Sequence, residues 1–211
     1  MKSIADCFLY GILDLGYVRL EHAARMAAEM IAGGIDVIQL RAKNLAEAEI
    51  LSIAKDLKPI TDEAGAPLII NDYPTLASAV GAEGVHLGQD DAPISEIKSV
   101  DHTIMIGKST HSVAQAVAAQ SEGANYIGFG PLFATPTKPD YVPIGLADIA
   151  RVDELVRIPI FCIGGIKLEN LASVLEAGAK RVVIVSGILK APDIIEYTRN
   201  AKALLLANPK S

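Results

Sequence analysis

The stretch PLIINDYPTLASAVGAEGVHLGQDD, residues 67–91, decides the fold. It contains two short apolar runs, residues 68–70 and 84–87, and polar residues follow each of them. Between the runs lies a segment with the length of a short helix, and its Pro74 stands where a helix commonly begins. A strand, a helix and a second strand in this order form the unit from which parallel sheets are built.

The same unit recurs along the whole chain of 211 residues. In the clearest helical segments, apolar residues recur at intervals of three and four. These segments are residues 21–32, 45–64, 112–122, 168–177 and 192–205. The apolar runs predict eight strands, at residues 7–13, 37–40, 68–70, 84–87, 103–106, 126–129, 158–163 and 181–185. Because these runs are continuously apolar, they suit a parallel sheet that is covered on both faces.

Polar residues and glycines distinguish a closed barrel from an open, doubly wound sheet, which is the alternative. An open sheet would concentrate them at one switch point, whereas a barrel gathers many loops around one mouth. Here they end or follow seven different strands, as Gln39, Asn71, Gln89, Ser109, Gly130, Gly164 and Ser186. The sequence therefore predicts an α/β chain folded as a single-domain (β/α)8 TIM barrel over residues 1–211.

The composition limits the partners. A net charge of -6 and a pI of about 5.2 exclude a global attraction to nucleic acid or to anionic membranes, so an anionic ligand needs local cations. The start of the chain lacks a signal-peptide pattern and an apolar span, so we expect a cytoplasmic location. Cys7 and Cys162 lie in apolar runs, which favours buried, inert thiols over a disulfide or a zinc site.

Two cations end the second predicted strand. Gln39, Arg41 and Lys43 alternate along an extended backbone, so they face the same side of the strand. Arginine offers a planar fork of donors and lysine a point charge, a combination suited to a diphosphate. A solvated charge pair at a strand end is the alternative.

Acidic residues follow the next two strands. Asp72 and Asp91 are candidates for Mg²⁺ binding, because two carboxylates completed by water and phosphate oxygens are a usual magnesium site. The alternative is that both acids cap helices, and for Asp90 we favour the cap. His86 lies inside an apolar strand and is a secondary candidate, since a lone histidine there is more often a hydrogen-bonded core residue.

The later loops carry groups suited to anions. Residues 107–112 combine hydroxyls with a helix start, although a plain helix cap is the favoured reading there. In the long segment of residues 128–139, Thr135, Thr137 and Lys138 form a second candidate anion clamp. Glycines in residues 163–166 and 185–188 follow the last two strands, where barrels commonly hold phosphate against backbone amides.

Taken in order, these segments resemble the thiamine phosphate synthase family, which shares a superfamily with the thiazole tautomerases. The resemblance runs from Tyr10 to Ile188 and rests on seven motifs: QLRAK at residues 39–43, ND at 71–72, HLGQDD at 86–91, GKSTHS at 107–112, GPLFATPTK at 130–138, IGGI at 163–166 and VVIVSGI at 182–188. It implies an enzyme that couples hydroxymethylpyrimidine diphosphate to a thiazole phosphate, usually its carboxylated form. The products are thiamine phosphate, diphosphate and, in that case, carbon dioxide.

The resemblance also implies residue roles. The pyrimidine diphosphate would be held by the QLRAK segment, with Gln39, Leu40, Arg41, Ala42 and Lys43, and by Asn71, Ser109 and Lys138. Mg²⁺ would be ligated by Asp72 and Asp91. The thiazole phosphate pocket would be lined by Thr135, Pro136, Thr137, Gly165, Val185 and Ser186. The residues implied to act in catalysis are Arg41, Lys43, Ser109 and Lys138. Among them Arg41, Lys43 and Lys138, together with Mg²⁺, would neutralise the departing diphosphate before the thiazole nitrogen captures the pyrimidine cation.

Two other functions stay open at this point. A thiazole tautomerase on the same barrel has no diphosphate to eject and typically lacks part of this set of cations and acids. A non-catalytic barrel would bind a thiamine precursor without turning it over. The partners expected are small molecules, without nucleic acid or membrane, and a homo-oligomer is left open. Residues 10–15, in the first strand, differ from the sequence more common in the family, which leaves the contacts near the first loop open.

Overall fold

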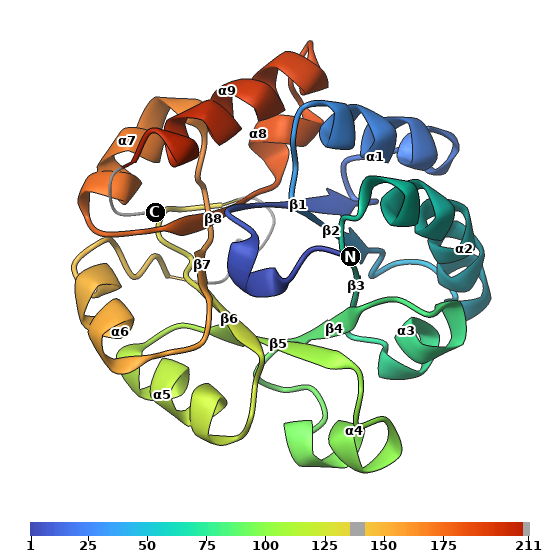
Figure 1. The fold of residues 1–211 in the computed structure, drawn as a ribbon, viewed down its shortest axis with the longest axis horizontal. Helices are drawn as coiled ribbons and strands as arrows, with labels where there is room; N and C mark the ends of the chain where they lie inside the picture. The colour runs from blue at the N-terminus through green and yellow to red at the C-terminus, as the bar shows by residue number, and fades with distance from the viewer. Residues whose placement is uncertain (136–141, 209–211) are drawn as a thin grey trace.

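The computed structural model describes residues 1–135 and 142–208. Eight parallel strands follow one another around a closed barrel, and the last strand pairs with the first. Figure 1 shows the ring of strands inside a ring of helices. The strands are β1 (Leu9–Asp14), β2 (Val37–Arg41), β3 (Leu68–Asn71), β4 (Gly84–Leu87), β5 (Met105–Thr110), β6 (Tyr126–Phe129), β7 (Ile160–Cys162) and β8 (Arg181–Ile184). The predicted (β/α)8 barrel is confirmed, and the open sheet is excluded.

Each strand of the barrel is followed by at least one helix. The helices are α1 (Ala23–Ala32), α2 (Glu47–Ala64), α3 (Pro74–Val80), α4 (Ile94–Val100), α5 (Val113–Ser121), α6 (Ile149–Leu155), α7 (Leu168–Glu176), α8 (Ser186–Leu189) and α9 (Ile194–Leu206). Two 3-10 turns, η1 (Ile4–Asp6) and η2 (Leu20–His22), precede β1 and α1. Within the described residues, none of these helices combines the length and the apolar composition needed to cross a bilayer.

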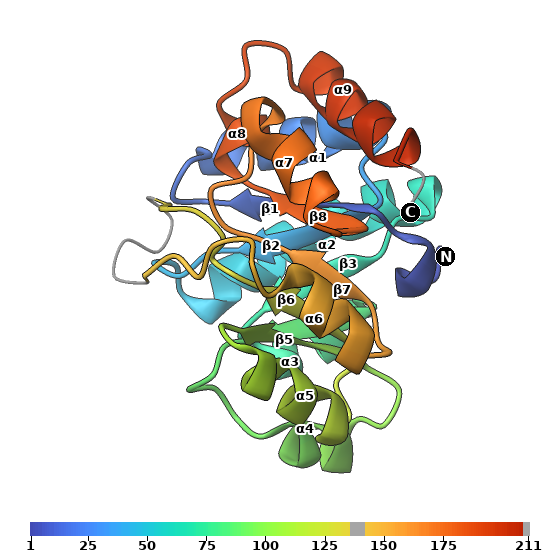
Figure 2. The same cartoon turned by 90° about the vertical axis from the view of Figure 1, so that its left-hand side faces the viewer.

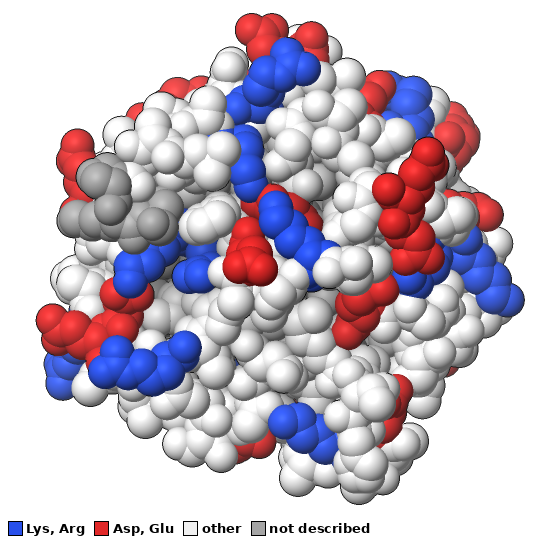
Figure 3. All heavy atoms as spheres, in the orientation of Figure 1, with Lys and Arg blue, Asp and Glu red and all other residues white. Residues whose placement is uncertain are grey.

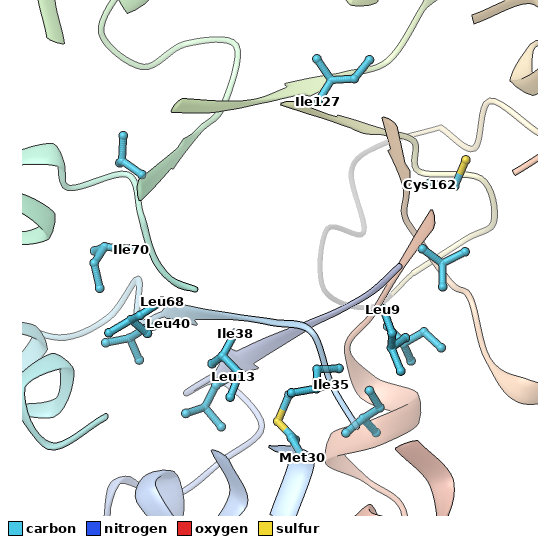
Figure 4. Packing of buried hydrophobic residues seen from close by; sticks show 14 of the residues in the cluster. Leu9, Leu13, Met30, Ile35, Ile38, Leu40, Leu68, Ile70, Ile127 and Cys162 are labelled. Atoms are coloured by element: carbon cyan, nitrogen blue, oxygen red, sulfur yellow. The ribbon is translucent and has the colours of Figure 1, made fainter. Parts of the chain in front are cut away.

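Side chains alternate between two apolar layers on either side of the strands. The outer layer packs against the helices, and Figure 4 shows Leu13, Leu40 and Ile127 pointing away from the ring of strands. The inner layer fills the barrel and includes Tyr10, Val37, Ile69, Tyr126 and Phe161. The continuous apolar runs in the sequence thus reflect burial on both faces of each strand.

The predicted end of the fifth strand was wrong. Residues 103–106 were expected, but β5 runs from Met105 to Thr110, so Ser109 lies in the strand and not in a loop after it. The reason is that the polar groups near its end are satisfied inside the sheet. The Thr110 hydroxyl donates to the Gly128 carbonyl at 2.9 Å, and Ser109 Oγ lies 3.0 Å from Nε2 of His86 on the neighbouring strand β4. Ser112 is the N-cap residue of helix α5, and its hydroxyl accepts a hydrogen bond from the Gln115 amide. The predicted helix cap is therefore confirmed.

An ionic cluster forms around Asp36 at the amino-terminal end of the barrel. Figure 2 places the chain start and η1 at one end of the barrel and the loop after β1 at the other. The buried Asp36 carboxylate accepts hydrogen bonds from the amides of Phe8 and Leu9 at 2.9 Å and pairs with Lys2 and Lys202. Although burial opposes ionisation, these donors hold the Asp36 pKa below its ordinary value. Figure 3 shows acidic and basic side chains intermingled over the middle of this face.

Candidate active site

A cavity opens at the carboxyl ends of the strands, where barrel enzymes hold their substrates. Its volume is about 90 Å³, and residues from all eight strands or the loops after them line it. The structure brings together these residues singled out in the sequence: Gln39, Arg41, Asn71, His86, Ser109, Thr135, Gly165, Val185 and Ser186. They span most of the chain, so only closure of the barrel makes them neighbours.

Arg41 is held by a buried ion pair. Its Nη1 lies 2.5 Å from Oδ2 of Asp14, at the end of the neighbouring strand β1, and the two residues are partners in the register of β1 and β2. The Asp14 side chain is 3% exposed and that of Arg41 14%, so little solvent screens the pair. The other Asp14 oxygen accepts from the Gly16 amide at 2.9 Å, which ties the first loop to the same carboxylate. Arg41 thus faces the cavity in a fixed orientation.

Two acids and a lysine meet beside the cavity. Lys43 Nζ lies 3.5 Å from Oδ2 of Asp72, and the lysine is half exposed. Burial and the neighbouring Asp91 carboxylate raise the pKa of Asp72, while Lys43 opposes the shift. Asp72 has a φ of 66°, a left-handed conformation that aspartate tolerates better than most residues. The two carboxylates are therefore close enough to influence each other's ionisation.

The helix-cap reading of these acids was wrong. The residue before α3 is Tyr73 and the residue before α4 is Pro93, and neither Asp72 nor Asp90 provides a side-chain cap. Asp91 instead accepts from the Gly88 amide at 2.5 Å and closes the turn after β4. Among the described residues, no group of three or more His, Cys, Asp or Glu side chains is arranged to hold a metal ion.

The loops after β6 and β7 pack tightly together above the cavity. Gly164 and Gly165 have φ values of 100° and 66°. A Cβ on Gly165 would lie 2.7 Å from the Ala134 carbonyl oxygen, and one on Gly164 would lie 2.4 Å from Pro131 Cα. Glycine is therefore required here both by the backbone conformation and by the approach of the neighbouring loop.

Val185 and Ser186 complete this side of the cavity. They stand at the junction of β8 and α8, and both line the cavity with Gly165. The Gly165 carbonyl accepts from Asn170 Nδ2 at 2.9 Å, which fixes the loop after β7 against α7. This hydrogen bond holds the backbone in this corner of the cavity in place.

Some predicted residues lie elsewhere. Leu40 and Ala42 are buried in the outer apolar layer, because alternation along β2 turns their side chains away from the cavity. Lys43 is half exposed at the edge of the site, and Asp72 and Asp91 lie beside it. Pro136, Thr137 and Lys138 fall outside the described residues.

Sequence reasoning missed two residues of the site. Asp14 ends an apolar run and carries no motif, and only the pairing of β1 with β2 shows that it meets Arg41. His111 lines the cavity, and its Nδ1 lies 2.5 Å from the Gly130 carbonyl oxygen, which bridges the loops after β5 and β6. Its position in the GKSTHS motif was the available signal.

Comparison with known proteins identifies relatives over most of the chain. The family described as thiamine monophosphate synthase matches residues 9–188. A thiamine-phosphate synthase of Chloroflexus aurantiacus is 39% identical over 206 residues, covering 97% of this chain and 95% of that protein. One from Halalkalibacterium halodurans is 45% identical over 168 residues, covering 79% of this chain and 80% of that protein.

Solved structures agree with this relationship. A thiamine phosphate pyrophosphorylase from Pyrococcus furiosus superposes with a TM-score of 0.89 at 33% identity, covering 96% of this chain and 97% of that one. A 3-hexulose-6-phosphate synthase, at a TM-score of 0.72 and 19% identity over 93% of this chain and 98% of that one, shares the fold. The sequence match, the barrel and the residues gathered at its mouth together show that this chain belongs to the thiamine monophosphate synthase family.

Proposed function

We propose that this chain is a thiamine phosphate synthase, a transferase that joins hydroxymethylpyrimidine diphosphate to a thiazole phosphate. The bond between the pyrimidine methylene carbon and the diphosphate oxygen breaks, and its electron pair leaves with diphosphate. The thiazole nitrogen then gives its lone pair to the methylene carbon. The observation that carries the proposal is the cavity, which Arg41, Asn71 and Ser109 line together with Gly165.

The charges around the cavity suit this reaction. Arg41 is fixed by Asp14 and would hold the diphosphate with two parallel hydrogen bonds, and Lys43 would add a mobile cation at the rim. Positive groups oriented before the reaction stabilise the charge that develops on a leaving group. Lys138 is proposed to act with them on the strength of the sequence motif.

Mg²⁺ is proposed as the cofactor, with Asp72 and Asp91 as its ligands. The donor set fits, since two carboxylates lie close enough that their mutual repulsion contributes to raising the pKa of Asp72. Magnesium is commonly held by one or two carboxylates, with water and substrate phosphates completing its shell. When bound, the ion would neutralise part of the diphosphate charge.

The remaining groups are proposed to position the second substrate and exclude water. Gly165, Val185 and Ser186, together with Thr135, Pro136 and Thr137, would bind the thiazole phosphate, with backbone amides facing its oxygens. Gln39 and Ser109 would orient the pyrimidine ring, with Leu40 and Ala42 as backbone neighbours in the binding segment. No side chain needs to form a covalent intermediate, because holding two reactants in a shared geometry already lowers the barrier.

We further propose that residues 1–211 act as one domain in the cytoplasm on small molecules alone. The negative net charge supports the absence of nucleic-acid and membrane partners. A homo-oligomer is compatible with this proposal.

One assay tests the function. The purified chain is mixed with both substrates and Mg²⁺, and diphosphate release is followed against mixtures that lack one component. Release that requires the thiazole phosphate supports the synthase. Isomerisation of a thiazole substrate without diphosphate release would instead indicate a tautomerase, and binding without turnover would indicate a non-catalytic carrier.

A further inference from the structure

A chain of hydrogen-bonded side chains crosses the barrel interior beneath the cavity, from Gln39 to Ser109. Gln39 Nε2 lies 2.8 Å from the Tyr10 hydroxyl, which lies 3.0 Å from the Tyr126 hydroxyl. His86 continues the chain, with Nδ1 at 3.1 Å from the Tyr126 hydroxyl and Nε2 at 3.0 Å from Ser109 Oγ. Every link is within hydrogen-bond range, and both end residues line the cavity.

The middle of this chain is rigid. Tyr10 and Tyr126 are 1% and 0% exposed, and the edge-on ring of Phe161 packs against both, with centroid separations of 5.3 Å and 5.7 Å. The backbone of β5 makes room for the rings at Gly107, where a Cβ would lie 2.1 Å from Tyr126 Cζ and 2.6 Å from His86 Nδ1. Two tyrosines and a histidine are therefore locked into one arrangement.

The donors and acceptors fix which way each hydrogen bond in this row of side chains points. Burial raises the pKa of both tyrosines well above the ordinary value, so each hydroxyl keeps its single proton. The Gln39 amide nitrogen donates to the Tyr10 hydroxyl. Because the Tyr10 proton also needs an acceptor and Tyr126 is its other hydrogen-bond partner, we infer that Tyr10 donates to Tyr126. Tyr126 must then give its proton to His86 Nδ1, since a buried hydroxyl proton needs an acceptor.

The same order of donors and acceptors continues through the imidazole ring of His86 to Ser109 at the cavity. When Nδ1 accepts, the neutral ring carries its proton on Nε2 and donates it to Ser109 Oγ. The Ser109 proton is then turned away from His86. Since the Ser109 side chain lines the cavity, its hydroxyl is presented there as a donor.

We propose that His86 is a positioning residue, which fixes the Ser109 hydroxyl as a hydrogen-bond donor to a ring nitrogen of the bound aminopyrimidine. This proposal rests on the proposed function and deepens it. His86 acts through Ser109, and Tyr126 acts through His86. The sequence treated His86 only as a secondary candidate, because nothing along the chain shows that two tyrosines from β1 and β6 stand behind it.

The first test reads the histidine tautomer and needs no activity. In the free protein with isotope-labelled histidine, NMR of the imidazole nitrogens is expected to show His86 protonated on Nε2 and unprotonated on Nδ1. Tyr126→Phe removes the donor to Nδ1 and is expected to abolish this preference. A wild-type ring protonated on Nδ1 alone overturns the proposal, whether or not the protein is a synthase.

The second test asks whether His86 works through Ser109. His86→Leu is expected to lower kcat/KM for the pyrimidine diphosphate by about 10-fold, the weight of one hydrogen bond, with KM for the thiazole phosphate unchanged. His86→Gln, which keeps one acceptor and one donor, is expected to recover most of this loss. In a Ser109→Ala variant, adding His86→Leu should lower kcat/KM by less than about a further 2-fold, because the hydroxyl that His86 positions is already absent.

A control variant and two contrary outcomes complete the second test. Thr61→Val removes a buried, hydrogen-bonded hydroxyl from α2, away from the cavity, and is expected to leave kcat/KM unchanged. Losses at His86 and Ser109 that add fully, or equal losses in the Leu and Gln variants, overturn the positioning role. If the wild-type chain releases no diphosphate, the proposed function fails, and the tautomer measurement still decides whether the chain of hydrogen bonds has the direction described.

Discussion

Asp14→Asn tests whether the buried partner of Arg41 is needed for both stability and turnover. The substitution keeps the size of the side chain and an acceptor for Gly16, and it removes the negative charge that lies 2.5 Å from the guanidinium. Charge centres about 4 Å apart attract by about 4 kcal/mol at an effective dielectric of about 20. Because the asparagine oxygen still accepts one hydrogen bond, we expect about 2 to 3 kcal/mol of this to be lost from the free energy of unfolding.

The assay combines unfolding with kinetics. For a chain of this length the expected loss lowers Tm by about 4 to 12 °C. With Arg41 no longer fixed, kcat/KM for the pyrimidine diphosphate is expected to fall by about 10-fold to 100-fold. The control is Asp153→Asn, which breaks the half-exposed pair with Lys180 and is expected to cost less than about 1 kcal/mol with activity unchanged. Equal effects of the two substitutions on Tm, or full activity of Asp14→Asn, would refute this account of Arg41.

Three further predictions follow from the site and the core. Asp72→Asn is expected to lower turnover by at least about 100-fold and to raise the Mg²⁺ concentration needed, whereas the exposed Asp62→Asn changes neither. Since the Asp72 pKa is raised in the fold, its contribution to stability is complete below the ordinary value of 3.8 and is lost as pH rises through the folded pKa. As pH rises from 3.8 through the folded pKa, the free energy of unfolding of the metal-free Asp72→Asn variant should therefore increase relative to that of the wild type, as urea unfolding would show. A difference in free energy of unfolding that does not change with pH would contradict the raised pKa of Asp72. Gly165→Ala is expected to raise KM for the thiazole phosphate by about 10-fold or more, because its Cβ strikes the neighbouring loop. The control is Gly65→Ala, because Gly65 has nearly the same φ and open space around it. This substitution should lower the free energy of unfolding by about 1 kcal/mol and leave activity unchanged. Equal KM values for the thiazole phosphate in the Gly165→Ala and Gly65→Ala variants would refute the steric argument. Burial raises the pKa of the Cys162 thiol to about 12, so a thiol reagent should label it only on unfolding, as mass spectrometry of the folded enzyme would test.

The fold could be predicted from the sequence because its signals are local. Apolar runs and helical periods recur at short intervals, and the polar residues at the strand ends require one shared mouth. The end of β5 could not be predicted in this way. Its polar residues are satisfied by groups on β4 and β6, which are distant in the chain until the sheet forms.

The site could be predicted in part for the same reason. Gln39 and Arg41 follow from alternation along a single strand, which the sequence displays. Asp14 could not be found, because its partnership with Arg41 depends on the register between two strands. Likewise, the orientation of Ser109 depends on a histidine and two tyrosines from three other strands, and no pattern within one segment reveals it.

The cluster around Asp36 has a consequence for how this protein can vary. It joins Lys2, near the start of the chain, to Lys202 in the last helix, at the end of the barrel opposite the cavity. Substitutions around this carboxylate are therefore expected to change the thermal stability of the protein without replacing any residue that lines the cavity.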